Sequence, residues 1–457
     1  MKRRKILNSI AIALIIISIP FSLKLVNQKT NFFNRASDLP ANLLIDANNV
    51  IETNKTEVWR NLAQGGEDRT RQLLPIQNEV KALRPKYIRI DHVFDYYSEA
   101  ESQSESELDL IIKDITATGA KPFVALSYMP PSLSSTGNTT DLPKDWAEWE
   151  NLVQKTVERI SGRNGLNISD VYYEVWNEPD LFGGFKTYGD KNYLDLYYHT
   201  AIGVQRATNV NNYKIGGPAV TGFYENWLNR LLVYTQENNL RLDFLSWHRY
   251  SKVLSDYEDD FNNSDHFQGY ETVISEMGPN SENDTVYDNN FSALHLIATT
   301  ALLEGKVDKI FNFEIKDGVG PEKYWGRWGM MTNEKWGTPE IKPRYRAVQF
   351  LNNLIGGKTI KVDGSGSFVK AIAKSNPPKG EASNKIQVLI VNYDHKGTHA
   401  EAVPLKITNL PSNNLKLKRI NFNGANSESV LNLESNTYET TLFFEPNSAS
   451  ILELTAL

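Results

Sequence analysis

The 457-residue chain contains no cysteine, and this absence excludes several kinds of site. Without thiols there is no disulfide, no thiolate-bound metal, no cysteine nucleophile and no lipid-modified cysteine anchor. For the same reason, the sequence does not indicate the redox compartment in which the protein works.

Basic residues are outnumbered by acidic ones, and histidine is scarce. Lysine and arginine number 49 against 55 aspartates and glutamates, so the formal net charge is −6. A nucleic-acid partner would need a basic patch, and we find no stripe of basic residues with interleaved aromatics. The seven histidines form neither an HxH pair at a strand end nor an HExxH motif, so we predict no metal site and no cofactor. A metal-dependent hydrolase is an alternative that inhibition by chelators would support.

One strongly hydrophobic run is present, at the N-terminus, and it is short for a full membrane span. Four consecutive basic residues (2–5) precede the run IALIIISIPFSL, and no clear small-residue cleavage site follows it. Basic residues at this place hold the N-terminus in the cytoplasm. We therefore expect residues 1–24 to be a signal anchor, or alternatively a cleaved signal peptide, and 25–40 to be a linker. The rest would be extracytoplasmic, membrane-anchored or secreted.

Short apolar segments alternate with amphipathic stretches between residues 41 and 356. The predicted strands are NLLID (42–46), KYIRI (86–90), PFVALS (122–127), VYYEVW (171–176), YKIGG (213–217), DFLSW (243–247), TVIS (272–275) and KIFNFEI (309–315). Residues 107–119, 146–160, 192–207 and 291–305 show apolar residues at helical spacing. Eight strand–helix units predict a (β/α)8 TIM barrel. An open doubly wound sheet is the competing α/β architecture, but the glycine-rich turn after its first strand is missing.

The pattern changes after residue 356. Residues 357–457 contain short strands such as KIQVLIVNYD and SASILELT, separated by polar turns, and no amphipathic run of helix length. This pattern predicts a C-terminal β-sandwich beside the barrel.

Two glutamates stand at the ends of predicted barrel strands. Glu178 follows VYYEVW, and Glu276 follows TVIS. Catalytic residues of such barrels lie at the C-terminal ends of strands. Two carboxylates facing each other there can hydrolyse a glycosidic bond, one donating a proton and the other, ionised, attacking the anomeric carbon. Strand order alone gives no distance between them, so retaining and inverting chemistry both stay open at this point.

Polar neighbours fit the same chemistry. Asn177 could hold a sugar hydroxyl, Tyr250 could donate a hydrogen bond to the nucleophile, and His248 could bind a carboxylate or substrate. Each of these residues alone would more simply be part of the core. Three other acidic residues at strand ends are expected to be structural ion pairs or substrate contacts: Asp46, Asp91 and Glu314. Glu174, two residues before Trp176 on the same strand face, is expected to be structural.

The segments VWNEPDL, KIGGPAV, LDFLSWHRYS and ETVISEMGP, in this order, resemble glycoside hydrolases of clan A. Within the clan, residues 80–355 are most similar to family 39, which includes β-xylosidases, α-L-iduronidases and exopolysaccharide hydrolases. The resemblance implies a retaining double displacement on a (β/α)8 barrel. By position, Glu178 matches the acid/base, Glu276 matches the nucleophile, and Asn177 matches the amide that binds the 2-hydroxyl.

Two departures from the family pattern affect sugar specificity. The family's Arg-x-His-Gly run is RIDH (89–92) here, with Asp91 in the place of the histidine. A tryptophan common at strand eight is replaced by Phe313. We expect Asp91, His92 and Phe313 to contact substrate, with Tyr324, Trp325 or Trp328 of the loop KYWGRWGMM supplying aromatic stacking. Packing of this loop against the sandwich is the alternative.

The sequence therefore predicts a retaining glycosidase whose partners are a polysaccharide or oligosaccharide and, through residues 1–24, a membrane. A catalytically silent carbohydrate-binding barrel is the first alternative, because a fold alone does not imply function. A transglycosylase using the same two glutamates is the second.

Overall fold

The computed structural model describes residues 38–65, 71–96, 106–376 and 384–457. The predicted anchor at 1–24 and most of the predicted linker lie outside these residues. Within the described ranges, no helix combines the length and the hydrophobicity needed to cross a membrane.

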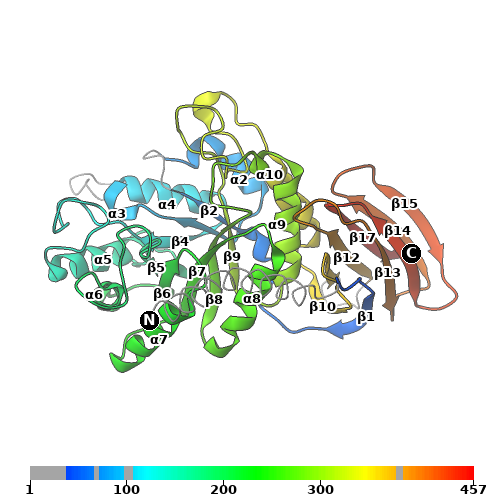
Figure 1. Cartoon of the computed structure of the whole chain (residues 1–457), viewed down its shortest axis with the longest axis horizontal. Coiled ribbons are helices and arrows are strands. Elements are labelled where there is room, and N and C mark those ends of the chain that lie inside the picture. The colour runs from blue at the N-terminus through cyan, green and yellow to red at the C-terminus, as the bar shows by residue number, and fades with distance from the viewer. Residues whose placement is uncertain (1–37, 66–70, 97–105, 377–383) are drawn as a thin grey trace, which may run out of the picture.

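Eight strands pair in sequence order, β2 to β9, and close into a parallel barrel (Figure 1). The strands are β2 (Asn61–Gln64), β3 (Tyr87–Ile90), β4 (Lys121–Leu126), β5 (Val171–Val175), β6 (Tyr213–Val220), β7 (Phe244–Tyr250), β8 (Glu271–Gly278) and β9 (Lys309–Phe313). Parallel strands need crossover connections, and here helices supply most of them.

The α-helices of the described residues are α2 (Gln77–Ala82), α3 (Val93–Tyr96), α4 (Glu107–Ala117), α5 (Trp146–Ile160), α6 (Tyr193–Arg206), α7 (Glu225–Glu237), α8 (Leu254–Ser264), α9 (Asn290–Leu303) and α10 (Pro343–Leu351). Helix α5 illustrates why they form. The side chain of Asp145 caps its first turn by accepting a hydrogen bond from the Ala147 N–H, and Trp149, Val153 and Val157 bury one face.

The barrel interior is packed rather than hollow. An aromatic-rich layer of Ala63, Phe123, Tyr172, Phe244, Val273 and Phe311 fills it. Two residues further along β3 and β5, toward their C-terminal ends, the inward positions are Arg89 and Glu174, which form a buried ion pair. The interior therefore changes from apolar to charged toward the barrel mouth.

A nine-stranded mixed sheet stands beside the barrel, with the order β15-β14-β17-β12-β11-β10-β1-β13-β16. Its strands are β1 (Leu43–Val50), β10 (Lys358–Asp363), β11 (Val369–Ser375), β12 (Lys385–Asn392), β13 (Glu401–Thr408), β14 (Asn414–Asn421), β15 (Ser427–Asn432), β16 (Tyr438–Phe444) and β17 (Ser448–Ala456). The sheet encloses its own core, and helix α9 lies between it and the barrel (Figure 1). The predicted TIM barrel with a C-terminal β domain is confirmed.

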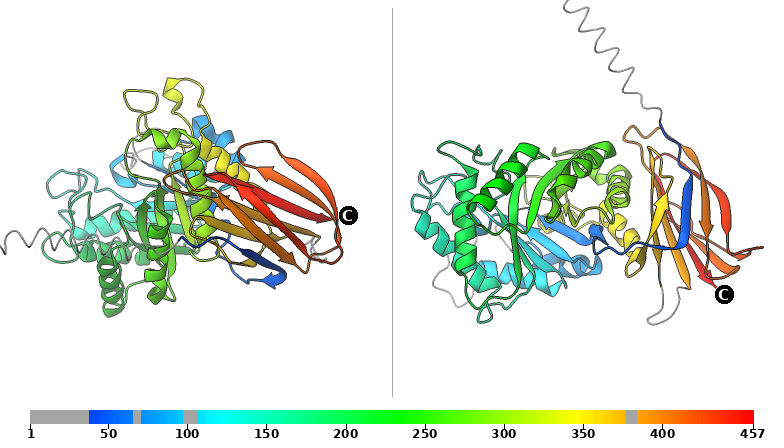
Figure 2. Two further views of the ribbon diagram at one scale, coloured as in Figure 1. Left: turned by 45° about the vertical axis from the view of Figure 1, so that its right-hand side comes forward. Right: turned by 90° about the horizontal axis from the view of Figure 1, so that it is seen from below.

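The prediction that residues 42–46 form the first barrel strand is wrong. These residues lie in β1, which pairs antiparallel with β10 and parallel with β13 in the nine-stranded sheet. Figure 2 shows this dark-blue strand among the yellow and orange strands of the sheet. The first barrel strand is β2 instead, which the hydrophobic pattern missed because two of its four residues, Asn61 and Gln64, are polar.

Strands β7 and β8 extend further than the sequence predicted and carry a register shift. Trp247 pairs with Ile274, but the next residue, His248, pairs with Glu276, so Ser275 is an extra residue on β8. A bulge of this kind turns the following side chain to a new direction. Here it sets Glu276 directly opposite His248.

Candidate active site

A pocket of about 730 Å³ opens at the C-terminal ends of the barrel strands. This volume falls in the range of about 300–1,000 Å³ common for small-molecule sites. Residues lining it are Gly65, Asp91, His92, Tyr128, Thr139, Thr140, Asn177, Glu178, Asp180, Leu181, Phe182, Thr221, Arg249, Tyr250, Glu276, Ser281, Phe313 and Trp328.

Glu178 reaches the pocket from an unusual backbone turn after β5. Trp176 and Glu178 both have left-handed backbone angles, with φ of 71° and 46°. Such angles are costly for residues other than glycine and persist only where the surroundings hold them. Here the Trp176 side chain is fully buried, and the Glu178 N–H donates to the carbonyl of Ala219 at 3.0 Å. The turn thus presents a carboxylate at the strand end.

Glu276 lies deeper and is 5% exposed. Its Oε1 accepts a hydrogen bond from Arg89 at 2.8 Å, and its Oε2 accepts one from the Tyr250 hydroxyl at 2.7 Å. Both donors stabilise the ionised form of the carboxylate.

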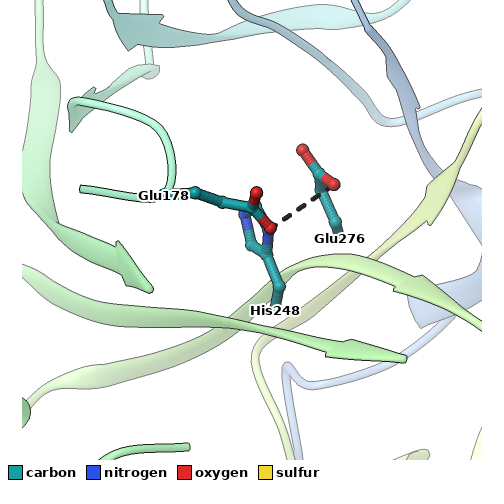
Figure 3. A group of neighbouring side chains, drawn as sticks. All are labelled: Glu178, His248 and Glu276. Carbon is teal, nitrogen blue, oxygen red and sulfur yellow. Dashed lines mark hydrogen bonds and ion pairs between the residues drawn. The ribbon is translucent and has the colours of Figure 1, made fainter. Parts of the chain in front are cut away.

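His248 lies between the two glutamates. Its Nδ1 is 2.8 Å from Oε1 of Glu178 and 3.5 Å from Oε2 of Glu276 (Figure 3). One oxygen of Glu178, one oxygen of Glu276 and a ring nitrogen of His248 all lie within 4.8 Å of one another. The two carboxylates predicted from distant parts of the sequence therefore meet over one pocket.

Arg89 organises the floor beneath this pair. Its guanidinium donates to Glu174 at 2.8 Å, to Glu276 at 2.8 Å and to the Asn177 side-chain oxygen at 2.7 Å. The Asn177 amide in turn donates to the Tyr128 hydroxyl at 2.9 Å. Arg89 is 1% exposed, so its charge is balanced by these carboxylates rather than by water.

The electrostatic environment shifts the acid–base behaviour of Glu276. Burial raises the pKa of Glu276 above the usual glutamate value, and the negative charges of Glu178 and Asp91 act in the same direction. The positive charges of His248 and Arg89 oppose this rise. For His248, burial acts to lower the pKa, but the neighbouring carboxylates of Glu276 and Glu178 outweigh it, and the pKa is raised. The imidazole is therefore suited to carry a proton between two carboxylates.

The same three side chains, Glu178, His248 and Glu276, could geometrically hold a metal ion. However, a metal would require neutral imidazole, whereas the two carboxylates favour the protonated ring. A shared proton on His248 is sufficient to explain why these groups approach one another.

The predicted substrate contacts are mostly found at the pocket. Five of them line it: Asp91, His92, Asn177, Tyr250 and Phe313. His248 lies just beneath, fully buried. Trp325 does not line this pocket; it is 39% exposed and its ring packs over Gly320. Trp328 of the same loop lies on the wall instead, 6.0 Å from the Phe313 ring.

Asp46 and Glu314 were predicted as structural pairs or substrate contacts. Asp46 lies in β1 of the sheet, outside the barrel, and accepts a hydrogen bond from Asn409. Glu314 is buried behind the wall and accepts hydrogen bonds from Gln64 and the Gly65 N–H. Neither lines the pocket.

Several site residues were not predicted. Arg89, Tyr128 and Asp180 all line or support the pocket. Arg89 could have been found from its place inside the apolar strand KYIRI, because a buried arginine requires carboxylate partners. The loop residues gave no such signal.

Comparison with known proteins shows similarity to glycoside hydrolases. The sequence model described as "Glycosyl hydrolases family 39" matches residues 67–263. The resemblance to glycoside hydrolase family 39 is confirmed. The β-xylosidase of Caldicellulosiruptor saccharolyticus is 32% identical over 157 residues, which cover 32% of this chain and 31% of that protein. The β-xylosidase of Geobacillus stearothermophilus is 27% identical over 241 residues, covering 48% of this chain and 47% of that protein.

The alignments thus span 31% and 47% of these two relatives, less than half of either protein. Among solved structures, the family 39 enzyme from Xanthomonas axonopodis pv. citri superposes with a TM-score of 0.71 at 18% identity. This match covers 93% of this chain and 99% of that one, so the two proteins share the complete barrel-plus-sheet fold.

Proposed function

We propose that this protein is a retaining O-glycoside hydrolase that uses Glu178 and Glu276. The observation that carries the proposal is the approach of the two carboxylates: one oxygen of Glu178 and one oxygen of Glu276 lie within 4.8 Å of each other. Retaining enzymes hold their carboxyl groups about 5–5.5 Å apart, whereas inverting enzymes need about 6.5–9.5 Å to admit a water.

In the first step, Glu178 donates its proton to the glycosidic oxygen while Glu276 attacks the anomeric carbon. The bond to the leaving group breaks, and an ester forms between the sugar and Glu276. In the second step, Glu178 takes a proton from water, which attacks the anomeric carbon and releases Glu276 as a carboxylate. The donors on Glu276, Arg89 and Tyr250, support its role as the ionised nucleophile.

His248 and Asn177 support these roles. His248 contacts both carboxylates and can balance the negative charge as the proton moves between substrate and Glu178. Asn177 is held by Arg89 and Tyr128 beside both glutamates, where its amide can bind a hydroxyl of the sugar at the reacting centre. Orientation of this kind accelerates attack by holding the reacting atoms close together.

The proposed substrate is a polysaccharide or an oligosaccharide. Because the two curated relatives are named β-xylosidases, aryl β-xylosides are the first substrates to assay. The hydrophobic run at residues 12–23, after its basic block, supports an extracytoplasmic setting with a membrane anchor.

The decisive experiment replaces each glutamate in a fragment of residues 38–457. Glu178→Gln should lower kcat on aryl glycosides by about 10²–10⁴-fold, the usual contribution of a general acid–base group. Glu276→Ala should abolish turnover. In a matched control, Glu237→Gln at the exposed end of α7 should keep full activity. NMR of the first-formed product should show the anomeric configuration of the substrate.

Full activity in Glu178→Gln or in Glu276→Ala would contradict the assignment of roles. Inverted product would contradict the retaining mechanism. Sugar binding without any released sugar would instead favour a catalytically silent barrel, and a product with a new glycosidic bond would favour transglycosylation.

A further inference from the structure

One charged group at the pocket has no partner in the described part of the chain. Asp91 directly follows β3, lines the pocket and is 7% exposed. Its Oδ1 is buried without any hydrogen-bond partner. A carboxylate removed from water without compensation is costly, so such a group is expected to have a ligand.

The other ionisable groups that line the pocket are already paired. The pairs are His92 with Asp95, Glu178 with His248, Asp180 with Thr221, Arg249 with Asp260, and Glu276 with Arg89. Among the described residues lining the pocket, Asp91 is therefore the one charged group without a hydrogen bond or ion pair to another side chain.

We propose that Asp91 determines glycone specificity: its carboxylate accepts hydrogen bonds from hydroxyl groups of an uncharged sugar and disfavours sugars that carry a carboxylate. This inference rests on the proposed glycosidase function and names its substrate class.

The charge distribution around Asp91 supports this choice. A uronic acid would bring another carboxylate into a pocket that Asp91, Glu178 and Glu276 already share. The cationic side chains at the pocket, Arg89, Arg249 and His248, each already contact carboxylates of their own. Sugar hydroxyls, by contrast, are donors, and a hydrogen bond to a charged acceptor is stronger than one between neutral groups. Asp91 would thus attract the hydroxyl groups of uncharged sugars and repel the carboxylate of uronic acids.

A small cavity behind Asp91 must be considered as well. It measures about 10 Å³ and is lined partly by Gln64, Gln72 and Asp114. This is close to the smallest volume that holds one water, about 10–15 Å³. A carboxylate offers about four acceptor sites, so a water in this cavity would leave acceptor capacity toward the pocket.

The test compares matched aryl glycosides that differ only in whether the sugar carries a hydroxymethyl or a carboxylate group: glucoside against glucuronide, and galactoside against galacturonide. We expect the wild type to prefer the neutral member of each pair. Asp91→Asn should lower kcat/KM on the neutral member by about 10–100-fold, the effect of losing a charged hydrogen bond. The kcat/KM on the uronide should not fall in this way. The ratio of kcat/KM on the neutral glycoside to kcat/KM on the uronide should therefore fall by the same factor.

Asp180→Asn is the matched control. It removes an equal charge from the pocket wall, but from a carboxylate that Thr221 already engages. If Asp91 itself sets the neutral-to-uronide ratio of kcat/KM, Asp180→Asn should change this ratio less than Asp91→Asn does. An equal change in both variants would indicate general electrostatics and overturn the proposal. So would a loss in Asp91→Asn that affects both sugars equally and accompanies a lower melting temperature.

A binding experiment separates this proposal from the hydrolase assignment. The same glycoside pairs are titrated calorimetrically into Glu178→Gln and into the double variant Glu178→Gln/Asp91→Asn. Loss of the neutral preference only in the double variant supports the role of Asp91, even if the wild type hydrolyses none of these compounds. An unchanged preference overturns it, even if the wild type is an active glycosidase.

Discussion

The carboxylate of Glu276 receives hydrogen bonds from two different strands, through Arg89 of β3 and Tyr250 of β7. These donors favour the ionised form, while burial and the charge of Glu178 favour the protonated form. In its proposed role as the nucleophile, Glu276 must be ionised. Activity should therefore fall as the pH drops through its pKa, which lies above the usual glutamate value.

Tyr250→Phe tests this balance. Removing the hydroxyl takes away a donor to the ionised carboxylate, so the pKa of Glu276 should rise further. We expect the acidic limb of the kcat/KM profile to move to higher pH, and kcat at neutral pH to fall by about 10–100-fold. A profile that superposes on the wild type would show that this hydrogen bond does not tune the nucleophile.

Single residues were predictable where the chemistry is encoded by residue type. Glu178 and Glu276 were identified because a carboxylate at the end of a buried strand is unusual. Tyr324, Trp325 and Trp328 were all candidates for stacking, because neighbouring aromatic residues in a loop look alike in sequence. Only the loop conformation decides which ring faces the pocket.

Helix α9 connects the two parts of the fold. Twelve of its 14 residues are buried, because it packs against the barrel on one side and against β11, β12 and β17 on the other. Within it, His295 is fully buried, and its Nε2 donates to the carbonyl of Ser251 at 2.8 Å. Its Nδ1 has no partner among the described residues, so this imidazole is neutral.

This buried histidine predicts a pH-dependent stability. Burial lowers the pKa of His295 to about 3 in the folded state, from 6.5 in the unfolded chain. The unfolded state therefore binds more protons between these values, so the contribution is complete above pH 6.5 and is lost as the pH falls below it. We expect the free energy of unfolding of the wild type to drop by roughly 1 kcal/mol more than that of His295→Gln between pH 7.5 and 5.5. Chemical denaturation at both pH values measures this, and parallel changes would contradict it.

The sequence predicted most segments correctly as helix or strand, but it did not always predict which sheet a strand joins. The pattern of NLLID correctly indicated a strand, yet nothing in 42–46 specifies which sheet it joins. Strand β2 has four residues and no hydrophobic alternation, so it gave too weak a signal. The bulge at Ser275 was equally invisible, because register depends on the neighbouring strand.

At the scale of the whole molecule, the first and last strands of the described residues, β1 and β17, lie in the same sheet, and the barrel lies between them in sequence. The segment leading into β1 is also tied to this sheet: Leu39 accepts a hydrogen bond from the Ser367 N–H, and the Ala41 N–H donates to Glu401. The nine-stranded sheet is therefore incomplete without residues 39–50.

Truncation tests this dependence. A fragment of residues 38–457 should unfold cooperatively, whereas a fragment of 51–457 should lose the link between β10 and β13. We expect β13 and β16 of the shorter fragment to become sensitive to proteolysis and its melting temperature to fall. Identical melting curves would show that β1 adds nothing to the sheet.

The place of β1 also affects the order of events on the ribosome. β1 ends at Val50, and its first partner, β10, begins at Lys358, about 300 residues later. At a synthesis rate of about 5–20 residues per second, this strand waits roughly 15–60 s before a partner exists. During that time its apolar side chains and open edge are exposed to other nascent chains. Of the strands in the described residues, the first to be translated is thus among the last to be paired.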